Sequence, residues 1–178
     1  MTTIQLSPQE GGVVQKILVE EGSMVRAGEP LLLLSNDNLD LEILNSEAEL
    51  AEKENILRNT MIQMEQQKLS VKQDEMTYEM DVRRSRRNYE QQSIAREEYL
   101  KAKEDYELAQ QKYKLVKERA VQDSLYRGVE INQMQESLDN MRQNMAMIRN
   151  RKSNLTIKAP IDGELGLLDV VLGQSVSS

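Results

Sequence analysis

The sequence predicts an α+β protein in which a long antiparallel two-helix coiled-coil hairpin is inserted into a small, split β unit. Residues 11–34 and 154–176 carry short β-branched runs punctuated by glycine, which is typical of strands. Between them, residues 37–153 keep an almost unbroken helical pattern, with no proline and a single glycine, Gly128. Helical arms of near-equal length would return the chain to its starting point, so we expect one β module made from both ends.

This division gives three expected segments. The first half of the β module covers residues 1–36, the helical hairpin covers 37–153 with its tip near 91–95, and the second half covers 154–178. In the first half, the expected strands are Ile4–Leu6, Val13–Val19 and Leu31–Leu34. In the second half, they are Leu155–Ile157, Leu165–Leu172 and a short strand at Val176.

Apolar residues recur every seven positions along the helical region, which indicates a left-handed coiled-coil seam. In the first arm they are Ile43, Leu50, Leu57, Met64, Val71 and Tyr78. In the second arm they are Tyr99, Ala102, Tyr106, Ala109, Tyr113, Val116 and Ala120, followed after Gly128 by Ile131, Met134, Leu138, Met141, Met145 and Ile148. The steps Val116→Ala120→Ser124 are two consecutive fours, so we predict a stutter there that relaxes the supercoil.

A single helix over the whole region would be implausibly long, so we expect a break at residues 91–95. Ser93 can cap the second helix, and Glu97 and Glu98 would complement the positive end of its dipole. Arginines within residues 83–87 precede the break, where cations suit a helix C-terminus.

Two helices result, over residues 38–91 and 94–153. Asp37 or Asn38 is expected to cap the first of them. At a rise of 1.5 Å per residue, each arm would span on the order of 80 Å.

Composition excludes several functions. The chain has no cysteine and no histidine, which removes thiol nucleophiles, imidazole bases, Ser-His-Asp triads and Cys/His zinc sites. We therefore expect no catalytic residue, no metal and no cofactor, and predict that the protein is not an enzyme. The net charge of −7 argues against a nucleic-acid partner. No apolar run approaches 18 residues, and we expect the chain to be a piece of a longer protein whose anchor lies elsewhere.

Three side-chain groups allow two interpretations each. The stripe of Tyr99, Tyr106 and Tyr113 would pack in the seam or stack on a ligand. The methionines within residues 134–147 would fill the core or bind copper. The arginines within residues 83–87 would form a solvated helix face or part of an interface at the tip.

The two β halves share a pattern of glycine, a hydrophobic run, and then Gly-x-x-Val, as in Gly22–Val25 and Gly173–Val176. This pattern resembles the lipoyl/biotinyl carrier fold, a flattened β-sandwich with quasi-two-fold symmetry. A carrier domain bears its cofactor on a lysine at the hairpin that joins the halves. Here the helical insertion occupies that position, and no lysine occurs between Lys16 and Lys53. The resemblance therefore implies a split lipoyl-like module rather than a swinging-arm carrier.

A split lipoyl-like module with an inserted helical hairpin resembles the periplasmic adaptor, or membrane fusion protein, family. Residues 155–163 (LTIKAPIDG) are similar to the segment in which that family re-enters its β module, and residues 14–28 are similar to its first half. The resemblance covers the whole chain in architecture. It implies a subunit that is anchored to the inner membrane, lies in the periplasm, and bridges an inner-membrane transporter to an outer-membrane channel of the TolC type. It also implies assembly into a ring.

The family's hairpin tip contacts the channel, and the resemblance places this contact at residues 84–95. Arg84 and Ile94 match the family's tip pattern, whereas Asn88 and Ala95 stand where the family has leucine and serine. The candidate channel-binding residues are Arg84, Arg87, Asn88, Tyr89, Gln91, Gln92, Ser93, Ile94 and Ala95. An ABC-type or type I-like transporter is favoured because the arms are long.

Two alternatives stay open. The chain could be a coiled-coil scaffold that dimerises through its seam and has no transport role, with its β halves at opposite ends of a rod. It could also be a lipoyl-type carrier domain, although the missing lysine argues against this interpretation.

Overall fold

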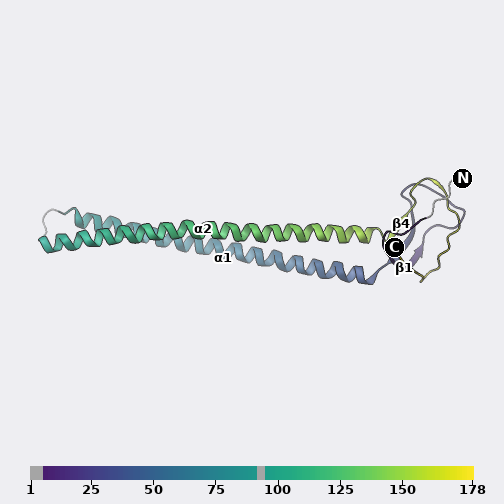
Figure 1. The fold of residues 1–178 in the computed structure, drawn as a ribbon, viewed down its shortest axis with the longest axis horizontal. Coiled ribbons are helices and arrows are strands. Elements are labelled where there is room, and N and C mark those ends of the chain that lie inside the picture. The colour runs from purple at the N-terminus through teal and green to yellow at the C-terminus, as the bar shows by residue number, and fades with distance from the viewer. Residues whose placement is uncertain (1–5, 92–94) are drawn as a thin grey trace. The chain divides into compact units, whose positions relative to one another are not determined.

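The computed structural model of this chain describes residues 6–91 and 95–178 and confirms the predicted α+β fold class (Figure 1). Two long helices and short antiparallel strands account for its regular structure. In chain order the elements are β1 (Gly12–Ile17), β2 (Met24–Val25), β3 (Pro30–Ser35), α1 (Asp37–Tyr89), α2 (Arg96–Ser153), β4 (Thr156–Lys158), β5 (Gly163–Glu164) and β6 (Ser175–Val176). The helices predicted over 38–91 and 94–153 are thus observed to within two residues at each end.

The chain forms two compact units. The first comprises the residues up to Glu52 together with Leu138–Ser178, and the second comprises Lys53–Ser137. The first unit therefore holds all the strands together with the start of α1 and the end of α2. The domain limits predicted at residues 36 and 153 lie elsewhere than the limits of these units, and they stay a prediction.

In the first unit, each strand of the second β half pairs with a strand of the first half. One sheet has the order β4-β3-β1-β6, and the other pairs β2 with β5, all antiparallel. In the larger sheet, Leu32 lies opposite both Ile17 on β1 and Ile157 on β4. This pairing builds one module from both ends of the chain. It contradicts the arrangement expected for the scaffold alternative, in which the β halves lie at opposite ends of a rod.

The core of this unit is aliphatic, and both helices contribute to it. Leu31 and Val14 are almost fully buried, and Leu39 of α1 and Ile148 of α2 belong to the same cluster. Burying side chains of this size stabilises a fold by about 1.5–3 kcal/mol each. The first turns of α1 and the last turns of α2 are therefore held on the β module by hydrophobic packing.

Two glycines are required by this packing. A Cβ on Gly12 would lie 2.6 Å from the Ser35 carbonyl oxygen on the neighbouring strand, so no larger residue fits without movement. Gly28 has φ of 85°, which L-residues rarely adopt, and its N–H donates to the Ala159 carbonyl oxygen at 2.7 Å. The turn at Gly28 thereby joins the first β half to the second.

Two predicted strands differ from the structure. Residues 165–172 contain no strand, because their backbone bonds to a turn instead: Leu165 exchanges hydrogen bonds with Ser23 and Gly22, and the Leu168 N–H donates to the Glu21 carboxylate at 2.8 Å. The strand was predicted because the segment is rich in apolar residues, but these residues are not all buried as a strand of the core would require: Leu167 is 90% exposed. For the strand expected at Ile4–Leu6, Ile4 lies outside the described residues and Leu6 is not in a strand.

The N-cap of α1 was also predicted at the wrong residue. Asn36, rather than Asp37 or Asn38, caps the helix: its side-chain oxygen accepts a hydrogen bond from the Leu39 N–H at 3.0 Å. The backbone carbonyl oxygen of Asn36 accepts a hydrogen bond from the Asp40 N–H, which is the first backbone hydrogen bond of the helix.

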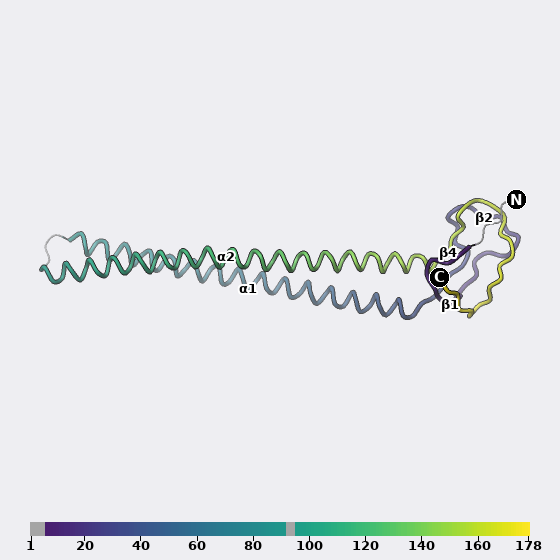
Figure 2. The backbone as a smooth tube through the Cα atoms, viewed as in Figure 1, coloured from purple at the N-terminus to yellow at the C-terminus, as the bar shows by residue number. Residues whose placement is uncertain are grey.

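In the second unit, α1 and α2 run side by side as a coiled coil (Figure 2). The predicted seam is confirmed there by burial, because its members are half-buried while most of their neighbours are exposed. These members are Leu57, Met64, Val71 and Tyr78 on α1, and Ala102, Tyr106, Ala109, Tyr113, Val116, Ala120, Ile131 and Met134 on α2. Tyr99 is the exception, at 40% exposed.

The predicted stutter is displaced along α2. Ser124 is exposed, and the inward positions after Ala120 are Asp123, Arg127 and Ile131, so the two consecutive four-residue steps begin at Asp123. Arg127 occupies the seam because its charge is satisfied there. It forms an ion pair with Asp123 and donates to the Met64 carbonyl oxygen of α1 at 3.1 Å. The side chain of Arg127 is only 12% exposed.

Candidate interaction sites at the two ends of the helices

The free ends of the two helices lie in the second unit and are largely exposed. α1 ends at Tyr89, and Gln91 follows it outside the helix. α2 begins at Arg96, and the Tyr99 N–H donates to the Ala95 carbonyl oxygen at 2.9 Å, which closes the first helical turn. The connection between the helices is therefore short and lies where the sequence predicts a break.

The described candidate residues all belong to this end of the second unit. Tyr89 is half-buried, and the others are exposed to solvent: Arg84, Arg87, Asn88, Gln91 and Ala95. Three further candidates, Gln92, Ser93 and Ile94, lie outside the described residues, and so does the cap predicted at Ser93. An exposed set of this kind suits contact with another protein.

The arginines near the end of α1 form exposed ion pairs with acidic residues three or four positions away in the sequence. Arg83 pairs with Glu79 at 2.8 Å, Arg84 with Asp81 at 2.9 Å, and Arg86 with Glu90 at 2.9 Å. A hydrogen bond and the negative charge of Glu90 raise the pKa of Arg86. Exposed pairs of this spacing contribute little to stability because water screens them, so a binding partner can replace them at little cost.

Arg87 differs from the arginines around it, because it makes no ion pair with any described residue. Its guanidinium group is therefore available for a carboxylate or a carbonyl oxygen on a partner.

Three tyrosines stack at this end of the unit. The ring of Tyr89 lies 5.4 Å from that of Tyr99, with 28° between their planes, and 5.7 Å from that of Tyr106, with 9° between their planes. The hydroxyl groups of Tyr89 and Tyr99 are 3.3 Å apart and share a hydrogen bond, which raises the pKa of Tyr89. The predicted seam role of the tyrosine stripe is therefore observed for Tyr106 and Tyr113, while Tyr99 packs at the rim of the seam.

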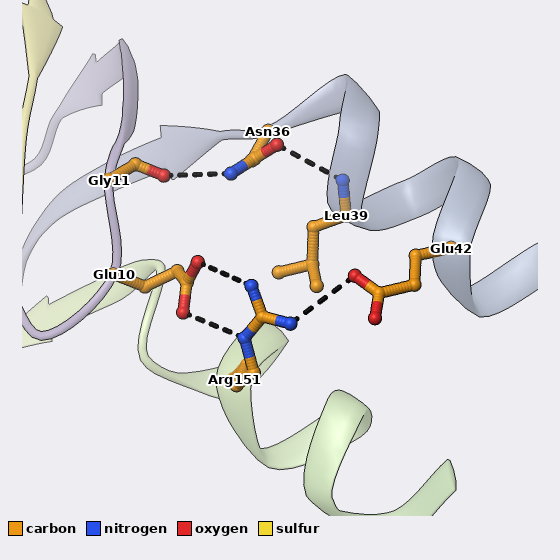
Figure 3. A network of polar contacts seen from close by, with 6 residues as sticks. All are labelled: Glu10, Gly11, Asn36, Leu39, Glu42 and Arg151. Atoms are coloured by element: carbon orange, nitrogen blue, oxygen red, sulfur yellow. Dashed lines mark hydrogen bonds and ion pairs between the residues drawn. The ribbon is translucent and has the colours of Figure 1, made fainter. Parts of the chain in front are cut away.

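A second polar arrangement, which the sequence reasoning missed, lies in the first unit (Figure 3). Arg151 in the last turn of α2 donates two hydrogen bonds to the Glu10 carboxylate, at 3.0 and 3.1 Å, and one to the Glu42 carboxylate of α1, at 3.2 Å. Beside it, the Asn36 amide group donates to the Gly11 carbonyl oxygen at 2.9 Å. This network ties the segment before β1 to the start of α1 and the end of α2.

Two more ion pairs join the helices in the first unit. Lys152 pairs with Asp40 at 2.8 Å, and Arg149 pairs with Glu47 at 2.9 Å. The sequence signal was present, since acids at the start of one antiparallel arm face bases at the end of the other. The guanidinium group of Arg151 lowers the pKa of Glu10, chiefly through their hydrogen bonds.

Over residues 6–91 and 95–178, the side chains form no cluster of three or more acidic groups able to hold a metal ion. Within the same described ranges, neither helix is apolar enough over a sufficient length to cross a membrane. No polar or charged residue among those described is buried in the core.

Several solved structures have a similar fold, and three of them are compared with this chain. MacA from Actinobacillus actinomycetemcomitans is 18% identical with a TM-score of 0.55, and the match covers 99% of this chain and 45% of that one. The periplasmic adaptor EmrA is 13% identical with a TM-score of 0.51, over 97% of this chain and 68% of that one. The soluble domain of LipC, a membrane fusion protein of a type I secretion system, is 12% identical with a TM-score of 0.51, over 99% of this chain and 96% of that one.

At these identities the structural likeness establishes the fold alone, and the chain spans less than half of the length of MacA. A comparison with curated protein sequences gives no match. The model of one protein family, described as the barrel-sandwich hybrid domain of RND membrane fusion proteins, matches residues 2–178, which is nearly the whole chain. The chain therefore belongs to the RND membrane fusion protein family, the periplasmic adaptors of tripartite efflux and secretion systems, a family that in general is not enzymatic.

Proposed function

We propose that this chain is the bridging part of an adaptor that links an inner-membrane transporter to an outer-membrane channel of the TolC type. The observation that carries the proposal is the pairing of both chain ends in one β module, for example β3 with β4, while two helices of 53 and 58 residues extend from it. A helical hairpin that starts and ends on one module serves to present its far end to a partner.

In this proposal the channel contacts the hairpin through the residues around its turn. These are Arg84, Arg87, Asn88, Tyr89, Gln91, Gln92, Ser93, Ile94 and Ala95. The assignment is supported by the exposure of their described members other than Tyr89, and by the arginine pairs, which are weak enough to exchange for partner contacts. Arg87, which has no ion pair with a described residue, is the strongest single candidate.

The finer parts of the proposal concern assembly. We propose that the full-length protein is anchored to the inner membrane, that several copies form a ring, and that the transporter is of the ABC type or type I-like. The long helical arms favour that transporter class, although the family description names the RND class. Purifying the full-length protein from its native membrane and identifying the co-purified transporter by mass spectrometry decides between the two classes.

The test of the channel contact uses the full-length protein with Arg87→Glu and a matched control, Arg58→Glu. Both arginines are exposed on α1 and lack an ion pair with a described residue, but Arg58 lies far along the helix from its end. Charge reversal at Arg87 should lower binding to a purified TolC-type channel at least tenfold and reduce export, while the Arg58 variant behaves as wild type. Equal binding by both variants would place the channel contact elsewhere.

A further inference from the structure

The end of the hairpin contains an aromatic arrangement with no counterpart elsewhere among the described residues. The chain has six tyrosines and no phenylalanine or tryptophan, and three of these tyrosines form one stack. Tyr89 is the last residue of α1, whereas Tyr99 and Tyr106 lie on α2 and are seven positions apart. Tyr89 thus stacks on two rings of the facing helix that are two helical turns apart.

The seam around the stack is built from small side chains, which leave room for the ring of Tyr89. Ala102 and Ala109 are the half-buried residues of α2 on either side of Tyr106, and Ser85 is half-buried on α1 one turn before Tyr89. In a coiled coil, a side chain inserts into a hole formed by residues of the facing helix. Tyr89 therefore acts as a knob that packs on Tyr99 and Tyr106, and Ala102 is the half-buried position between those two on α2.

A helix end is the part of a helix that frays most readily, because its last carbonyl groups lack partners within the helix. Here the final residue of α1 is held by two ring contacts and by the hydroxyl hydrogen bond to Tyr99. The contacts fix both the axial position and the rotation of the α1 end relative to α2. They therefore also fix where exposed neighbours such as Arg87 and Asn88 point.

We propose that Tyr89, Tyr99 and Tyr106 are positioning residues that hold the end of the hairpin in the one geometry that its channel partner contacts. This inference rests on the proposed function, since it assumes that the channel binds at this end. The tyrosines act mainly through their neighbours, because Tyr89 and Tyr106 are half-buried. Their loss should disturb the geometry of the end before it disturbs the rest of the hairpin.

The geometry is tested in this chain without the channel, by measuring a distance across the end of the hairpin. The chain contains no cysteine, so spin labels at Arg87→Cys and Lys101→Cys report one distance by pulsed electron paramagnetic resonance. Tyr89→Ala should at least double the width of the distance distribution, and Tyr89→Phe, which keeps the ring, should leave it narrow. Tyr126→Ala is the matched control, because Tyr126 is a tyrosine of α2 outside the stack and is 71% exposed.

A second variant and a second readout guard against misfolding. Ala102→Leu keeps all three rings but fills the hole, so it should broaden the distribution as Tyr89→Ala does. The near-ultraviolet circular dichroism of this chain arises from tyrosine alone. Tyr89→Ala and Ala102→Leu should each lose most of this signal, whereas Tyr89→Phe should retain it. An unchanged distance width in both Tyr89→Ala and Ala102→Leu would overturn the inference, whatever the channel does.

Binding of the full-length variants to a purified TolC-type channel completes the test. Tyr89→Ala should weaken binding about tenfold and Tyr89→Phe less than twofold. If Arg87→Glu abolishes binding while Tyr89→Ala leaves it unchanged, the positioning role is refuted and the proposed channel contact stands. If neither change affects binding, both the positioning role and the proposed contact are refuted.

Discussion

Removing the Asn36 side chain tests how the helical hairpin is joined to the β module. Asn36 makes two side-chain hydrogen bonds: it accepts from the Leu39 N–H at 3.0 Å and donates to the Gly11 carbonyl oxygen at 2.9 Å. Loss of an N-cap costs about 1 kcal/mol, and loss of a second hydrogen bond costs about 0.5–1.5 kcal/mol. Asn36→Ala should therefore lower the free energy of unfolding of this unit by about 2 kcal/mol.

The two contributions can be separated with conservative variants. Asn36→Ser keeps an N-capping oxygen but is too short to reach Gly11, so it should lose about 1 kcal/mol. Asn38→Ala is the matched control: Asn38 lies two residues further on, is exposed, and should change stability by less than about 0.5 kcal/mol. The assay is urea unfolding followed by far-ultraviolet circular dichroism.

Equal destabilisation by Asn36→Ala and Asn38→Ala would refute the assignment of Asn36 as the cap. A loss no larger in Asn36→Ala than in Asn36→Ser would show that the cap contributes nothing, and an unchanged stability in Asn36→Ser would show the same of the bond to Gly11.

Further predictions concern other parts of the chain. Gly12→Ala should destabilise the β module by more than about 1 kcal/mol, because the new Cβ would lie 2.6 Å from a carbonyl oxygen of β3; thermal unfolding measures the loss. Asp123→Ala leaves the largely buried Arg127 without its carboxylate partner and should lower the free energy of unfolding by about 1–3 kcal/mol. The double variant Asp123→Ala with Arg127→Leu should regain most of this lost stability, as measured by urea unfolding. The pKa of Glu10 is lowered in the folded state, so the contribution of this carboxylate to stability is present above its unfolded pKa of 4.5 and is lost as pH falls below that value. Arg151→Met should weaken this pH dependence when the free energy of unfolding is measured across acidic pH. An unchanged dependence of stability on pH below 4.5 would contradict the pairing.

The order of strands and helices along the chain was predictable because it follows from repeating patterns of apolar residues. Seven-residue spacing from Ile43 to Tyr78 defines a helix seam, and glycine-punctuated apolar runs at both chain ends define strands. The return of the chain to one β module follows from the near-equal arms. Such features depend on many residues at once, so an error at one position does not change the result.

Single-residue features were predicted less well, since each depends on a competition between local partners. Asn36, Asp37 and Asn38 are all good caps by residue type, and only the geometry at the end of β3 selects Asn36. Ser124 was preferred over a charged residue in the seam, but Arg127 and Asp123 neutralise each other there. Residues 165–172 are apolar enough for a strand, yet their backbone bonds are made to the turn at residues 21–23.

The candidate tip could be located from the sequence but not described in detail. The break between helices follows from the lengths of the arms and from the arginines before it. Its stacked tyrosines were visible only as part of a stripe, because the seven-residue spacing does not reveal that Tyr89 inserts between Tyr99 and Tyr106.

Site-specific photo-crosslinking in cells tests the central claim most directly. A photoreactive residue is placed at Asn88 of the full-length protein, at the exposed end of α1, and at Gln66 as a control that is exposed in the middle of α1. We expect the photoreactive residue at position 88 to form a covalent adduct with a TolC-type outer-membrane channel, and the one at position 66 to form none. Active export with a channel adduct from Gln66 and none from Asn88 would contradict it.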